Sequence, residues 1–208
     1  MKGISTIAIL LLASALVFGQ GFSVGANAGT SYNILNFDNV GVDTYSGFGF
    51  GGGLVLDIAF LPMLGVEVDI LYSSYKYSFS GEVLGEPASE TITINNLVIP
   101  ILLKYKMATS TVSPYFLLGP SIIKNLNGTI EVTVLGVTKS GDISNDKLET
   151  DFGFQIGAGA NVGVISQMCI SPCVRFQYNL TGDRDWMQGV SESMYDFLFG
   201  LSFTYKIK

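Results

Sequence analysis

Residues 48–60 read FGFGGGLVLDIAF, and this stretch decides the fold of the chain. Every even position holds an apolar residue or glycine, whereas the odd positions hold Gly, Val, Asp and Ala. Successive side chains of a strand point to opposite faces, so one face is apolar and aromatic and the other is small or charged. A soluble barrel would turn the apolar face inward. Glycines and an ion on the opposite face suit a narrow polar interior with lipid outside, which predicts a membrane-spanning strand.

The beginning of the chain predicts a signal peptide. Lys2 gives a positive start, residues 4–18 form an apolar run, and Gly19 suits cleavage. The run is shorter than the roughly 20 residues that a helix needs to span a bilayer, which argues against a retained anchor. No Cys follows it, which argues against a lipoprotein. We therefore expect a signal peptide over 1–19 and one mature domain over 20–208.

Composition narrows the class of protein further. The mean hydropathy is +0.44, yet no other apolar stretch is long enough for a membrane helix. Only helices and closed barrels satisfy their backbone groups in lipid, so a barrel remains. The net charge is −6, and removal of Lys2 with the signal makes it −7, which argues against nucleic acid as a partner.

Eight segments of the chain alternate in the manner of strands, and the connections between them differ in length. We expect strands at 22–32, 46–60, 64–73, 96–106, from 114 onward, 152–162, 169–178 and 197–206. The phase of the fifth is ambiguous because residues 115–118 are all apolar. Long connections (33–45, 80–89, 125–150 and 181–193) alternate with short ones near 62, 108–112 and 166–167. This asymmetry predicts an all-β, eight-stranded antiparallel up-and-down transmembrane β-barrel with short periplasmic turns and long external loops.

Alternation continues beyond the expected membrane band in several segments. Tyr75, Tyr77 and Phe79 alternate, as do residues 92–94 and 130–134, which predicts external hairpins. The apolar positions change from even to odd numbers near Ser73 and Ser74, which predicts a β-bulge there.

Four segments carry a resemblance to a known family. Residues 97–106, 114–121, 151–159 and 200–205 are similar to strands of the small outer-membrane β-barrel proteins often labelled porin-family, which share their architecture with the OmpA and OmpX barrels. The last segment resembles the insertion signal read by the barrel assembly machinery, with Gly200, Phe203 and Tyr205 as its glycine and spaced aromatics. It differs from that signal because three further residues, 206–208, follow the final aromatic residue, whereas the signal ends on the aromatic residue itself. The resemblance implies a bacterial outer-membrane location and transient contact with the assembly machinery.

Charged and amide side chains fall on the expected lumen face. An eight-stranded barrel has an interior that side chains just fill, and buried charges must be paired. We expect a polar network in the lumen formed by Glu67, Asp69, Lys104, Gln155, Arg175 and Gln177. One reading makes this network a structural plug. The alternative is a path for protons or ions, since Glu67 and Asp69 could share a proton or bind a cation.

Aromatic residues on the opposite face are expected to form belts at the two membrane interfaces, where rings with a polar edge are favoured. The belt residues are Tyr72, Tyr105, Tyr115, Phe176, Tyr178, Phe203 and Tyr205.

The chain offers little for catalysis. It contains no His, so a Ser–His arrangement is impossible. A G-x-G-x-x-G match at residues 47–52 lies within a strand and precedes no helix, so no nucleotide site or other cofactor is expected. Cys169 and Cys173 lie four residues apart on one strand face, about 13 Å at ordinary strand rise. This spacing favours two thiols, although a bulge at Pro172 would allow a disulfide.

These observations predict a monomeric, non-enzymatic outer-membrane barrel whose acidic external loops have a structural, adhesion or recognition role. Its expected partners are membrane lipid and lipopolysaccharide, with an external ligand at the loops. The first alternative is a narrow channel for small solutes, although water-filled porins have 16–18 strands. The second is a soluble lipocalin-like binding barrel, in which Glu67 and Arg175 would be exposed while Phe154 and Phe203 would be enclosed.

Overall fold

The computed structural model describes residues 21–37, 44–83, 85–107, 112–143, 150–181 and 192–207. The expected signal peptide at 1–19 lies outside the described residues. None of the described segments forms a helix long and apolar enough to cross a bilayer.

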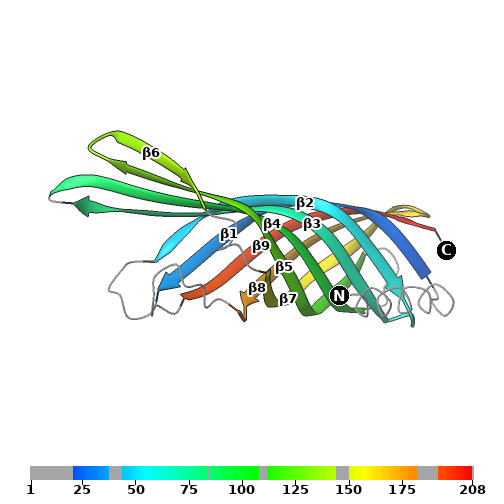
Figure 1. Cartoon of the computed structure of the whole chain (residues 1–208). Helices are drawn as coiled ribbons and strands as arrows, with labels where there is room; N and C mark the ends of the chain where they lie inside the picture. The colour runs from blue at the N-terminus through cyan, green and yellow to red at the C-terminus, as the bar shows by residue number, and fades with distance from the viewer. Residues whose placement is uncertain are drawn as a thin grey trace.

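The described segments form nine strands, eight of which close into a barrel (Figure 1). Each strand pairs antiparallel with its ring neighbours, and β9 pairs with β1 to close the ring. β6 lies outside the ring because it pairs only with the end of β5, while the rest of β5 pairs with β7. The predicted eight-stranded antiparallel barrel is confirmed. The strands are β1 (Gly21–Phe37), β2 (Tyr45–Ala59), β3 (Leu64–Val83), β4 (Glu86–Lys106), β5 (Val112–Val134), β6 (Val137–Asp142), β7 (Thr150–Ile165), β8 (Met168–Asn179) and β9 (Glu192–Lys206).

The two faces of the barrel wall differ as the alternation predicts. Phe48 is 73 % exposed on the outside of β2, whereas Glu67 and Arg175 are each only 3 % exposed. Phe154 and Phe203 lie on the outer surface, 40 % and 49 % exposed. The soluble lipocalin-like alternative is therefore wrong, because it requires the reverse arrangement.

Two of the expected long loops are largely strand. β3 and β4 remain paired as far as Val83 and Glu86, and β5 continues to Val134 before turning into β6. The β5–β6 turn uses Leu135 and Gly136, both at positive φ (54° and 74°), which is typical of the tightest hairpin turns. Parts of β3, β4 and β5 thus join β6 in a four-stranded external sheet that extends beyond the barrel wall (Figure 1).

The β-bulge expected near Ser73 and Ser74 is wrong. β3 pairs with β4 in one unbroken register, and Ser73, Tyr75 and Tyr77 occupy successive interior positions. The interior changes from polar to apolar along β3, while the strand keeps its phase. The register instead shifts between β4 and β5, where Asn95 and Asn96 pair with residues 127 and 125 and leave residue 126 extra on β5.

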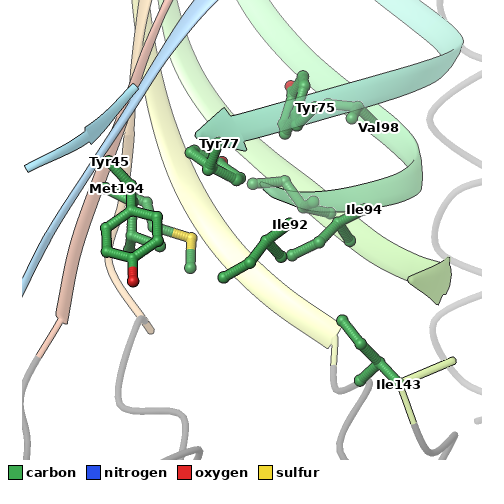
Figure 2. Packing of buried hydrophobic residues seen from close by; sticks show 10 residues of the cluster. Tyr45, Tyr75, Tyr77, Ile92, Ile94, Val98, Ile143 and Met194 are labelled. Atoms are coloured by element: carbon green, nitrogen blue, oxygen red, sulfur yellow. The ribbon is translucent and has the colours of Figure 1, made fainter. Parts of the chain in front are cut away.

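An apolar cluster fills the interior where the external sheet leaves the barrel. Figure 2 shows side chains from β2, β3, β4 and β9 in this cluster, with Tyr77, Ile92 and Met194 each at most 6 % exposed. Ile143, which follows β6, also joins it and anchors the base of the β5–β6 hairpin. We call this cluster the apolar cap; its buried members are Leu35, Tyr45, Tyr75, Tyr77, Ile92, Ile94, Val98, Ile123, Ile143 and Met194.

Candidate functional site

Arg175 of β8 ties together opposite walls of the barrel. Three strands separate β8 from β3 in either direction around the ring, yet the Arg175 guanidinium reaches both acidic side chains of β3. Nη1 donates to Asp69 Oδ2 at 2.6 Å, and Nη2 donates to Glu67 Oε1 at 2.6 Å. The two hydrogen bonds use the fork geometry that distinguishes arginine from lysine.

Lys104 of β4 connects the same carboxylate to a third acid. Its Nζ donates to Glu67 Oε2 at 2.5 Å and to Asp57 Oδ2 at 2.8 Å, and it lies 4.2 Å from the centre of the Tyr115 ring. Lys106 Nζ donates to Asp57 Oδ1 at 3.1 Å. Three carboxylates therefore meet three cations, and the cluster is electrically neutral. We call it the ion cluster.

Asp57 and Lys106 are members of the ion cluster that the expected network omitted. The sequence pattern could have identified Asp57, because it is the charged residue in the alternating stretch 48–60. In the structure Asp57 pairs directly with Glu67 across β2 and β3. Two carboxylates opposite each other on adjacent strands repel, so they require a shared cation. Lys104 meets this requirement by contacting both of them.

The expected amide members form a separate group. Gln155 Nε2 donates to Gln177 Oε1 at 2.6 Å, and Gln177 Nε2 donates to Asp196 Oδ2 at 3.1 Å. Asn179 Oδ1 also lies 3.3 Å from Gln177 Nε2. Within the described residues no hydrogen bond joins these side chains to Arg175. The lumen therefore contains an ion cluster and an amide group, which the sequence pattern had merged into one network.

The geometry of the ion cluster favours a structural role over a catalytic or metal-binding role. Each carboxylate of the ion cluster has a cationic partner, and all three are at most 7 % exposed. Across the ranges that the structure describes, no group of three His, Cys, Asp or Glu side chains could hold a metal ion. Buried charges are tolerated when they are paired in this way, so the geometry cross-links the barrel walls.

The aromatic residues divide between the two faces. Tyr72, Tyr105, Tyr178, Phe203 and Tyr205 are 40–49 % exposed on the outer surface. Phe176 also faces outward and packs on Phe197 with ring centres 5.3 Å apart.

Tyr115 is the exception, and its assignment to the aromatic belt is wrong. It is 2 % exposed inside the barrel, where its ring packs over the Lys104 ammonium. In β5 the odd-numbered residues face inward as far as Asn125, where the register shift changes the phase. The apolar run 115–118 could not reveal this phase, because both faces looked alike.

The expected assembly signal and the cysteines lie on the last two strands. Phe203 and Tyr205 face outward, while Gly200 lies inside the wall and pairs with Cys173. Cys169 and Cys173 are free thiols on the same inner face of β8. β8 pairs with β9 in unbroken register through Pro172, so the bulge that a disulfide would require is absent.

Comparison with known proteins gives the same architecture. Outer membrane protein OprG from Pseudomonas aeruginosa is 15 % identical, with 91 % of this chain and 97 % of that chain covered at a TM-score of 0.56. Neisserial surface protein A is 16 % identical, with 89 % and 97 % covered at a TM-score of 0.50. At these identities the likeness concerns the fold alone. A search of curated proteins found no match.

The family comparison covers almost the whole chain. The model of the outer membrane protein beta-barrel domain matches residues 5–206, which include all eight strands of the ring and the external sheet. The apolar outer wall and the paired charges inside agree with a protein that lies in lipid. The chain therefore belongs to the outer membrane β-barrel domain family and is a protein of the bacterial outer membrane.

Proposed function

We propose that this protein is a non-enzymatic surface-recognition barrel whose external sheet carries the binding surface. The observation that carries the proposal is a row of hydroxyl groups across this sheet. Ser80, Ser89, Thr133 and Thr138 pair in register across β3, β4, β5 and β6, and the hydroxyls of Thr133 and Thr138 are 2.9 Å apart. Such a hydroxyl-rich face offers donors and acceptors to a polar partner.

The opposite face of the external sheet has a structural role in this proposal. Ile130 packs against the apolar cap, and Phe79 stacks on Tyr45 with ring centres 5.3 Å apart. Tyr45 in turn donates a hydrogen bond to Glu90 Oε2 at 2.8 Å. These contacts hold the sheet to the barrel, so the hydroxyl face is presented on a rigid support.

Removal of the β5–β6 hairpin tests this function. Gly128 and Ile143 are adjacent, with Ile143 N donating to Gly128 O at 2.8 Å. Replacing residues 129–142 by Asn-Gly, a sequence that favours a tight turn, should keep the barrel and remove two strands of the sheet. Cells displaying this variant are expected to lose attachment to epithelial monolayers and to one another.

The double variant Thr133→Ala/Thr138→Ala should weaken attachment while leaving the hairpin intact. Ser166→Ala, in the turn at the opposite end of the barrel, is the matched control and should have no effect. Heat-modified gel mobility verifies that each barrel is folded. Attachment by the hairpin variant equal to that of the original chain would refute the recognition role.

The channel alternative makes a different prediction. The ion cluster crosses the lumen, and the apolar cap packs Tyr77, Ile94 and Val98 at 3 % exposure or less above it. Water and ions would have to displace both layers. We therefore expect no stable conductance steps when the purified protein is added to planar bilayers. Large, reproducible steps would favour solute transport instead.

A further inference from the structure

A cavity of about 350 Å³ opens at the end of the barrel opposite the external sheet. Its wall includes the β2–β3 and β7–β8 turns and the first and last residues of the ring, and this short-turn end faces the periplasm in outer-membrane barrels. The volume lies within the roughly 300–1,000 Å³ range of ligand pockets. We call this cavity the vestibule. Its polar lining residues include Asp57, Lys106, Asn161, Thr204 and Lys206.

The Asp57 carboxylate and the Asn161 amide oxygen, which line the vestibule, already accept hydrogen bonds. Asp57 accepts from Lys104 and Lys106 in the ion cluster. Asn161 Oδ1 accepts from the Ser171 hydroxyl at 2.8 Å. The Asn161 amide is thereby oriented with its oxygen engaged. Its NH₂ group remains as a donor, because it carries no hydrogen bond within the described part of the chain.

Among the described residues, the vestibule also carries a positive charge that no carboxylate pairs with. The ion cluster is neutral, with Lys106 at its edge as its most exposed cation, 20 % exposed in the side chain. Lys206 adds a further ammonium group from β9. Even-numbered residues of β9 face inward, and Lys206 pairs with Ser23 at the mouth of the barrel. No carboxylate among the described residues pairs with Lys206.

We propose that the vestibule binds a small oxyanion, a phosphate or carboxylate group, between Lys206 and the free amide donor of Asn161. Ammonium and amide groups hold such anions through charge-assisted hydrogen bonds. Two sources offer the same chemistry, namely a phospholipid headgroup of the periplasmic leaflet and a free anionic solute. The vestibule is separated from the external sheet by the whole length of the barrel, so this site does not depend on the recognition role.

The test uses inorganic phosphate as the probe. The mature barrel, folded in a phosphate-free maltoside detergent at low ionic strength, is labelled with ¹⁵N-lysine and titrated with phosphate. Saturable shifts of the Lys106 and Lys206 signals are expected. Lys206→Met should weaken binding by about tenfold or more, since a hydrogen bond to a charged group contributes ~1.5–3 kcal/mol and 1.4 kcal/mol is tenfold.

Lys139→Met is the matched control, because Lys139 is exposed on β6 at the other end of the molecule. It should leave the affinity unchanged. Equal affinity of the original chain and Lys206→Met, or an equal loss in Lys139→Met, would overturn the proposal, as would the absence of saturable binding. Gel mobility shows whether Lys206→Met folds. Asn161→Asp, which replaces the amide donor by a negative charge, should also weaken binding.

Native mass spectrometry of protein extracted from membranes distinguishes the two sources. Bound phospholipid that is lost in Lys206→Met and displaced by phosphate assigns the site to a headgroup. Phosphate binding without copurified lipid assigns it to a free anion. Either result supports an oxyanion site.

Discussion

Replacing Arg175 by alanine is expected to lower the free energy of unfolding of the barrel by about 3–5 kcal/mol. The substitution leaves Asp69 without a cationic hydrogen-bond partner and removes one of the two cations that contact Glu67. Both carboxylates are at most 3 % exposed, so water cannot replace the lost contacts. The link between β8 and the opposite wall is also lost. Reversible urea unfolding from lipid vesicles, followed by heat-modified gel mobility, measures the change.

A pair of control variants separates charge from geometry. Arg175→Lys keeps the positive charge but replaces the fork by a single ammonium group, so an intermediate loss is expected. Lys139→Ala removes a charge from an exposed position of β6 and should change the free energy of unfolding by no more than about 0.5 kcal/mol. Stability of Arg175→Ala close to that of Lys139→Ala would show that the ion cluster does not hold the barrel together.

Replacing Ile156 by lysine is expected to cost about 2–4 kcal/mol, the penalty for a cation near the middle of the lipid-facing wall. Ile156 is 47 % exposed and lies midway along the outward positions of β7, between Phe152 and Ala160. On the surface of a water-soluble protein, a lysine at such an exposed position would cost almost nothing. The same unfolding measurement in vesicles gives the difference.

Thr138→Lys is the matched control for this prediction. Thr138 lies on the exposed strand β6, outside the ring, so lysine there meets water and should leave stability unchanged. A negligible effect of Ile156→Lys would contradict a lipid-facing position for β7. Similar losses for the two lysine variants would indicate that the effect comes from charge in general rather than from lipid.

The alternation of apolar residues on the outer face with glycine and polar residues on the inner face was enough to predict the barrel architecture. Residues 48–60 indicate which face of the strand meets lipid, because side chains alternate between the two faces with a period of two residues. This period can be read from neighbouring residues in the sequence alone. The same local rule placed Glu67, Asp69, Lys104 and Arg175 inside and Phe203 and Tyr205 outside. Alternating long and short connections then gave the antiparallel order of the ring. Each of these inferences depends on neighbours in the sequence.

The phase of β5 and the pairing of the interior charges were determined only by the tertiary structure, because no single strand contains this information. Residues 115–118 are apolar on both faces, and only the pairing of β5 with β4 and β7 places Tyr115 over Lys104. In β3 the local pattern was misleading, since the interior changes from paired charges to the apolar cap without a change of phase. Which charges meet depends on strands that lie opposite each other in the closed ring, as β3 and β8 do. Closure and register are properties of the whole sheet, so the partners of Arg175 and the vestibule beneath the ion cluster follow only from the assembled barrel.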